Sequence, residues 1–136
     1  MRIKTAFLAA LWVMVWLPFV APSAVQAAQP QLTLVLFVQP ACPWCDKLEK
    51  DLANNPDFMR YLNTQFRMET VDIRDKEPLK AFAGKSGKEL SKQYRVRITP
   101  TTVLLKDGEK FGRIPGYIEP KDYRDVVKQY MEQAGL

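Results

Sequence analysis

The chain has 136 residues, of which 47% are apolar and 26% are charged, and its formal net charge is +5. This length accommodates one domain, and the composition is that of an ordinary globular protein with a modest core. The basic residues are scattered among acidic ones without a run of five like charges, so we expect no nucleic-acid-binding surface.

The N-terminus has the features of a signal peptide. Two basic residues precede an uncharged apolar run over residues 6–22, and "VQA" at residues 25–27 matches the pattern that a signal peptidase cleaves. We therefore expect cleavage after Ala27, which assigns residues 1–27 to a signal peptide and residues 28–136 to one exported domain. The alternative is an uncleaved membrane anchor, because the apolar run approaches the roughly 18 residues of a membrane-spanning helix.

The first part of this domain carries a β pattern followed by an α pattern. Residues 32–38 form a nearly unbroken apolar run, which predicts a strand buried on both faces. After a turn come Cys42 and Cys45, the only cysteines in the chain, in the sequence "CPWC". Apolar residues at i, i+3, i+7 and i+8 from Cys45 predict an amphipathic helix over residues 45–53, with Cys42 at its start and Ala53 on its apolar face.

Cap residues and turn signals indicate the remaining elements. The patterns predict a helix over 56–65 capped by Asn55, a strand over 66–73, a loop over 74–85, a helix over 88–94 after the capping box of Ser86 and Glu89, strands over 101–105 and 110–114 around an Asp107-Gly108 turn, and a helix from Pro120. This order predicts an α/β fold with a central mixed four-stranded sheet flanked by helices.

The chain contains no histidine, which narrows the chemistry of the cysteine pair. A closed zinc site needs four ligands, and two thiols alone do not supply them. Covalent haem attachment needs a histidine at the position of Asp46. A disulfide between residues so close in sequence constrains the unfolded chain little, so the pair is also poorly placed as a structural staple. We expect no metal, and no cofactor other than a redox-active Cys42–Cys45 disulfide.

Disulfide exchange suits the pair because the two cysteines occupy different positions. At the start of a helix, Cys42 faces backbone N–H groups and the positive end of the helix dipole, which favour the thiolate and lower its pKa. Cys45 lies one turn further along on the apolar stripe, from which it can attack a mixed disulfide on Cys42. The sequence therefore predicts an exposed attacking Cys42 and a shielded resolving Cys45.

Two further features support exchange with a protein partner. Pro100 stands directly before the third predicted strand, where a proline forgoes a ladder hydrogen bond. An ordinary turn is one interpretation; beside a cysteine pair, a cis Thr99-Pro100 bond that leaves the Thr99 backbone free to bind a partner is the other. Trp44, between the cysteines, is expected to be exposed and to contact the partner.

Three segments resemble the thioredoxin superfamily and, within it, the small periplasmic thioredoxin-like proteins associated with sulfur-oxidation (Sox) systems: "FVQPACPWCDKL", "VRITPTTVLLKDG" and "GRIPGYIEPKDY". The resemblance extends over essentially all of residues 28–136. It implies a thioredoxin fold, thiol-disulfide exchange through Cys42 and Cys45, a cis Pro100, and Gly116 packed near the site.

The resemblance also implies a location and partners. We expect a monomeric periplasmic reductase that exchanges disulfides with protein partners and receives electrons from a membrane thiol transporter. The alternatives are an oxidase that donates its disulfide to exported proteins, and a docking module whose disulfide is merely structural. The residues expected to position a partner are Pro43, Trp44, Thr99, Pro100 and Gly116.

This sequence departs from thioredoxins proper at two places. Thioredoxins have a buried acid six residues before the first cysteine, and here that position is Leu36, so Glu69 or a water molecule would have to serve the resolving thiol. The dipeptide between the cysteines is Pro43-Trp44 rather than Gly-Pro. Because this dipeptide tunes the thiolate, the redox direction does not carry over from thioredoxin itself.

Four other side chains have two interpretations each. Lys47, Arg95 and Arg97 either raise the positive potential near the thiolate or are simply solvated. Tyr117, next to Gly116, either lines the partner groove or packs against the fold.

Overall fold

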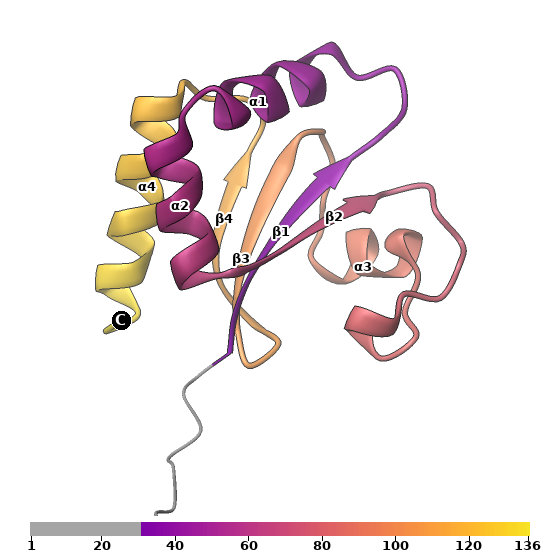
Figure 1. Cartoon of the computed structure of the whole chain (residues 1–136). Helices are drawn as coiled ribbons and strands as arrows, with labels where there is room; N and C mark the ends of the chain where they lie inside the picture. The colour runs from indigo at the N-terminus through magenta and orange to yellow at the C-terminus, as the bar shows by residue number, and fades with distance from the viewer. Residues whose placement is uncertain (1–30) are drawn as a thin grey trace, which may run out of the picture.

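Four strands and four α-helices form residues 31–136, the part of the chain that the computed structural model describes (Figure 1). The elements are β1 (Leu32–Val38), α1 (Pro43–Ala53), α2 (Pro56–Gln65), β2 (Arg67–Asp72), the short 3₁₀ helix η1 (Lys80–Phe82), α3 (Gly87–Gln93), β3 (Thr101–Lys106), β4 (Glu109–Pro115) and α4 (Pro120–Gln133). The predicted signal peptide and its cleavage site lie outside the described residues.

The sheet is mixed, with strand order β2-β1-β3-β4. β1 runs parallel to β2 and antiparallel to β3, and β3 forms an antiparallel hairpin with β4. Figure 1 shows α1, α2 and α4 on one side of the sheet and α3 on the other. The mixed four-stranded sheet flanked by helices that the sequence predicts is therefore confirmed.

β1 is buried on both faces because helices cover both sides of the sheet. Leu34 and Leu36 pack in one apolar cluster with side chains of α1, α2 and α4, whereas Val35 and Phe37 pack in a second cluster with α3. Successive side chains of a strand point to opposite faces, so an apolar run without alternation is what a two-sided environment requires.

α1 begins two residues before the predicted helix. Cys42 is its N-cap and Pro43 takes the first helical position, where the missing N–H of proline costs nothing. Cys45, Leu48 and Leu52 are buried as the spacing predicts. Ala53 is exposed, and its assignment to the buried face is wrong, because α1 ends at this residue and the chain turns toward α2.

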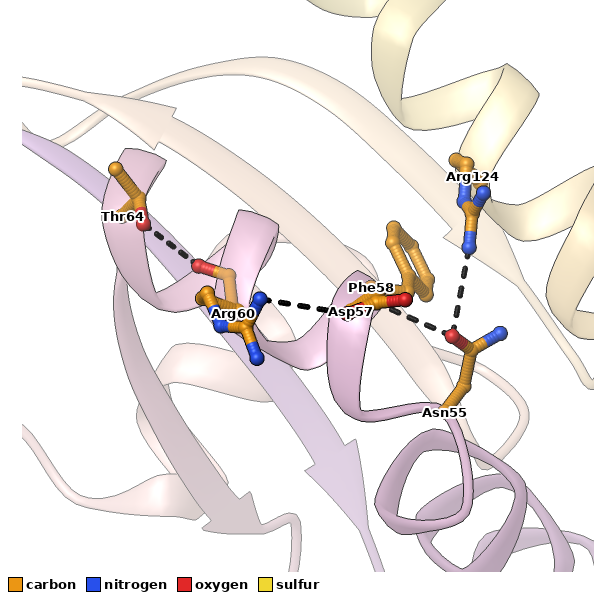
Figure 2. Close-up of polar contacts among 6 residues, drawn as sticks. All are labelled: Asn55, Asp57, Phe58, Arg60, Thr64 and Arg124. Atoms are coloured by element: carbon orange, nitrogen blue, oxygen red, sulfur yellow. Dashed lines mark hydrogen bonds and ion pairs between the residues drawn. The ribbon is translucent and has the colours of Figure 1, made fainter.

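The start of α2 is fastened to α4 through Asn55. The Asn55 side-chain oxygen accepts a hydrogen bond from the backbone N–H of Phe58 at 3.3 Å and one from Arg124 of α4 at 3.4 Å (Figure 2). The Arg124 guanidinium also lies 5.0 Å from the centroid of the Phe58 ring. One amide therefore caps a helix and links two helices of the same layer.

Replacement of Asn55 by alanine is expected to lower the free energy of unfolding by about 1 kcal/mol or slightly more, because the cap and the Arg124 contact are lost together. Asn55→Asp is the matched control, since its carboxylate keeps an acceptor for both donors. Urea denaturation followed by circular dichroism measures the difference. Equal losses in the two variants would show that the cap contributes nothing.

Residues 74–85, predicted as a loop, contain the short helix η1, and Pro78 in this segment forms a β-bridge with Ser86, the residue that follows it. The predicted capping box is confirmed: the Ser86 hydroxyl accepts from the backbone N–H of Glu89 at 3.3 Å, and the Glu89 carboxylate accepts from the backbone N–H of Ser86 at 2.8 Å. The capping box fixes the start of α3, and Leu90 in the following turn packs in the core. Within residues 31–136, no helix combines the length and apolar character needed to cross a membrane.

Candidate functional site

A disulfide joins Cys42 and Cys45 where the chain passes from the end of β1 into α1, with their Cα atoms 5.2 Å apart. The backbone N–H of Cys45 donates to the Cys42 Sγ at 3.2 Å, while the Cys42 carbonyl accepts from the N–H groups of Cys45 and Asp46. The Cys42 sulfur thus occupies the N-cap of α1. A thiolate at this atom would be stabilised by a fixed N–H donor and by the helix dipole.

The expected difference in exposure between the two cysteines is wrong for this disulfide form. Cys42 is 6% exposed and Cys45 is 3% exposed, so both are buried. Thr99 lies beside the Cys42 sulfur, with its hydroxyl 3.5 Å from the Sγ, and helps to bury it. The asymmetry is one of partners instead: the Cys42 sulfur contacts the helix N-terminus and Thr99, whereas Cys45 belongs to the buried stripe of α1.

Thr99 and Pro100 lead into β3 next to the disulfide, and the peptide bond between them is cis. Pro100 is buried and its carbonyl accepts from the Gly116 N–H at 2.8 Å, which ties this segment to the end of β4. The backbone N–H and C=O of Thr99 make no hydrogen bond with residues 31–136. An extended segment of another protein could pair with these two groups immediately beside the sulfurs.

An open pocket of about 250 Å³ adjoins the disulfide through Thr99. Its lining combines three of the residues predicted to position a partner with two others, and consists of Trp44, Ile98, Thr99, Gly116 and Tyr117. Trp44 is 57% exposed and Ile98 is 53% exposed, which is unusual for such large apolar side chains. Pro43 begins α1 and is exposed, but it does not line this pocket.

Gly116 is required in the pocket for a conformational reason. Its φ of +79° lies in the left-handed region, and a Cβ atom there would stand 3.5 Å from Ile98. A side chain at this position would be strained and would project toward the apolar lining. The glycine therefore allows the left-handed backbone after β4 and leaves the space beside Ile98 unfilled.

Tyr117 is held in the pocket by a cluster on the exposed side of α1. Its ring lies 5.4 Å from the Trp44 ring, and its hydroxyl donates to Asp51 at 2.8 Å. Lys47 forms an ion pair with Asp51 at 2.8 Å and lies 4.7 Å from the centroid of the Tyr117 ring. Tyr117 therefore lines the groove and also packs, and Lys47 has a carboxylate partner. Asp51 was not among the residues predicted for the site, although its i, i+4 spacing from Lys47 indicates such an ion pair.

The Lys47 ammonium, and then the Tyr117 hydroxyl, lower the pKa of the Asp51 carboxyl. The contacts that need the Asp51 carboxylate are therefore present above its ordinary pKa and are lost as the pH falls through the lowered value. The carboxylate thus remains ionised at neutral pH and keeps Tyr117 oriented beside Trp44.

A Lys47→Gln variant is expected to raise the pKa of Asp51 toward its ordinary value, and Tyr117→Phe is expected to raise it by less, because Lys47 is the larger cause. Carboxyl NMR titration measures both. Lys50→Gln is the matched control, since Lys50 is a smaller influence on this carboxyl. An equal shift in Lys50→Gln would contradict the cluster as described.

Among residues 31–136, no acidic side chain is buried in place of the carboxylate that the resemblance to thioredoxins implies. Leu36 is buried in the α1 cluster. Glu69 lies opposite Val35, whose side chain is on the α3 face, and pairs with Arg67 at 3.3 Å, so its suggested role beneath Cys45 is wrong. Within residues 31–136 the buried polar side chains are all hydroxyls.

One of these hydroxyls, that of Thr102, forms an unpredicted pair with the buried hydroxyl of Tyr123. Thr102 lies opposite Leu36 in the sheet, and its Oγ1 is 2.7 Å from the Tyr123 hydroxyl of α4. Burial raises the pKa of Tyr123, so this side chain stays neutral. A neutral hydroxyl pair therefore stands beside the position at which the superfamily places a carboxylate.

Arg95 and Arg97, which the sequence placed near the thiolate or in solvent, line a second pocket. This pocket adjoins the one that contains Trp44 and Thr99, because Ile98 lines both. Among residues 31–136, no group of three or more His, Cys, Asp or Glu side chains is arranged to hold a metal ion.

Comparison with known protein families gives a match over most of the chain. The family described as a thioredoxin-like domain matches residues 20–131. Comparison with curated protein sequences gave no significant match.

Several solved structures are similar to this one. A thioredoxin-fold protein from Helicobacter pylori is 25% identical, with a TM-score of 0.60 over 74% of this chain and 72% of that one. A thioredoxin from Thermus thermophilus is 26% identical, with a TM-score of 0.56 over 76% and 74%. The reduced periplasmic thioredoxin SoxS from Paracoccus pantotrophus is 23% identical, with a TM-score of 0.57 over 76% and 99%, and at that identity it bears on the fold alone.

Proposed function

Because this chain belongs to the thioredoxin-like family, has the thioredoxin fold and is a thiol-disulfide oxidoreductase, we propose that it is a monomeric periplasmic reductase of protein disulfides that works through its CPWC pair. The observation that carries the proposal is the setting of the Cys42 sulfur. A helix N–H lies 3.2 Å from it, and Thr99, with a backbone free to pair, lies beside it.

The reductive cycle has two exchange steps. The Cys42 thiolate attacks one sulfur of the partner's disulfide, which forms a mixed disulfide and releases the other partner sulfur as a thiolate that takes up a proton. The Cys45 thiol then loses its proton and attacks the Cys42 sulfur, which releases the second partner thiol and forms the Cys42–Cys45 disulfide. Two electrons pass from the protein to the partner, and a membrane thiol transporter returns two electrons to the disulfide.

The surface around the sulfurs supports a protein partner. Trp44 and Ile98 are exposed apolar side chains that line one pocket with Thr99. Tryptophan in particular is enriched among the residues that carry the binding energy of protein interfaces. An extended partner segment that paired with the Thr99 backbone would bring its own sulfur toward Cys42. The subfamily resemblance supports the reductive direction and the periplasmic location.

The reduction potential separates the proposal from its rival, an oxidase that donates the disulfide. We expect equilibration with glutathione buffers, read by Trp44 fluorescence or alkylation, to give a potential near the roughly −270 mV of thioredoxin. A value near about −120 mV, typical of a strong oxidant, would overturn the reductive direction. Trapping with Cys45→Ser in the native host is expected to accumulate mixed disulfides with exported proteins; captured partners without an exported segment would contradict the location.

A further inference from the structure

Three arginines gather in a pocket of about 380 Å³ beside the redox site. Arg95, Arg97 and Arg113 line it together with the apolar side chains of Ile98 and Pro115 and with Thr101. Ile98 also lines the pocket that contains Trp44 and Thr99. The cationic pocket is therefore continuous with the surface next to the disulfide.

The positive charge of this pocket is not neutralised within the described part of the chain. The ion pairs among residues 31–136 join Lys47 to Asp51, Arg60 to Asp57 and Arg67 to Glu69, and none includes an arginine of the pocket. Arg113 donates one hydrogen bond, to the carbonyl of Arg95 at 3.1 Å. Arg95 and Arg97 are exposed. Their guanidinium donors are thus available to carboxylates of another molecule.

The distance along the backbone from the arginine pocket to Thr99 is short enough for one polypeptide partner to contact both. Arg97 is two residues from Thr99, which spans at most about 7 Å. A partner segment that paired with the Thr99 backbone would continue past Ile98 at about 3.3 Å per residue. Its side chains within about four residues of the reacting cysteine would then reach the arginines.

We propose that this pocket, formed by Arg95, Arg97 and Arg113, selects protein partners that carry acidic side chains within about four residues of the cysteine that reacts with Cys42. The inference rests on the proposed exchange with protein partners and adds a partner class to it. A polypeptide fits better than a small anion, because only a chain occupies the Thr99 backbone and the arginine pocket together. Charge complementarity of this kind acts mainly on the rate of association.

The test uses two synthetic peptides that differ only in charge. Each contains one cysteine blocked as a disulfide with the neutral thiol 2-mercaptoethanol; one carries two Glu residues within four positions of the cysteine, and the other carries Gln there. Reduced protein is mixed with each peptide, and the second-order rate constants are measured by acid quench and chromatography. The readout is the ratio of the Glu rate constant to the Gln rate constant, because a change in thiol reactivity alone cancels in it.

The wild-type protein is expected to favour the Glu peptide by about ten-fold at low salt, and the ratio is expected to fall as salt is added. Arg97→Gln should reduce the ratio about three-fold, in line with the modest strength of exposed charge pairs, and Arg97→Glu should bring it to unity or below. Arg97→Lys should retain most of it. Lys128→Gln, which removes an exposed charge from the far half of α4, is the matched control and should leave the ratio unchanged.

Equal rates for the two peptides in the wild-type protein, or an equal loss in Lys128→Gln and Arg97→Gln, would overturn the inference. A reaction with the neutral disulfide of 2-mercaptoethanol separates this result from failure of the proposed function. If the protein reduces that small disulfide and does not distinguish the peptides, the arginine pocket has no selective role. If it reduces neither, the proposed reductase function is overturned as well.

Discussion

Cys42→Ser is expected to abolish the dithiothreitol-dependent reduction of insulin, leaving only the rate of the buffer without protein. A serine hydroxyl cannot form the mixed disulfide, so the first exchange step has no nucleophile. Cys45→Ser is expected to retain that first step and to stall as a mixed disulfide on Cys42. Insulin turbidity measures turnover, and non-reducing electrophoresis detects the stalled complex.

Trp44→Ala separates the loss of a nucleophile from the loss of a contact surface, because it keeps both thiols and removes an exposed side chain. It is expected to slow insulin reduction without stopping it. Unchanged activity in Cys42→Ser would identify the Cys42–Cys45 bond as merely structural, as in a docking module. Because the two cysteine residues are almost equally buried, activity in Cys42→Ser is the measurement that separates an exchanging disulfide from a structural one.

Leu48→Ala is expected to lower the free energy of unfolding by about 2–5 kcal/mol. Leu48 is fully buried in the cluster between α1 and the sheet, one turn after Cys45. Truncation leaves a cavity under the helix whose first turn holds the disulfide. For a domain of this size, a loss of that order lowers the melting temperature by roughly 8 °C or more.

The matched control for Leu48→Ala is Glu49→Ala, at the next position of the same helix. Glu49 is exposed and alanine is a good helix former, so the change in stability should stay within about 0.5 kcal/mol. Thermal unfolding monitored by circular dichroism, with both variants oxidised, gives the comparison. A melting temperature of Leu48→Ala equal to that of Glu49→Ala would show that α1 is not held to the sheet through this side chain.

Local sequence signals predicted the elements well where they were strong. The continuous apolar run of β1, the Asn55 cap and the Ser86–Glu89 capping box each rest on interactions within a few residues, and the structure contains all three. The structure of residues 74–85 could not be predicted from local patterns. The helix η1 and the Pro78–Ser86 bridge depend on how this segment folds back on itself. The prediction that Ala53 is buried was wrong for a related reason. Ala53 has the spacing of the apolar face, but α1 ends at this residue.

The site was predictable in its chemistry and less so in its surroundings. The spacing of Cys42 and Cys45 before an amphipathic helix indicates disulfide exchange, since one turn of helix brings the two sulfurs together. The burial of Cys42 was not predictable, because Thr99, which lies beside its sulfur, is 57 positions away in the chain. The hydrogen bond between Tyr117 and Asp51 was not predictable either, because these residues are 66 positions apart in the chain.

The sequence by itself determined the redox pair, the order of helices and strands, and the presence of leucine rather than an acid at position 36. These depend only on residue identity and on neighbours within a turn or a strand. Only the tertiary structure decided that Glu69 faces the opposite side of the sheet from Leu36, that hydroxyls of Thr102 and Tyr123 meet beside it, and that Arg113 joins Arg95 and Arg97. Sheet register and the packing of α4 bring these groups together or hold them apart, and neither is encoded in any short stretch of the chain.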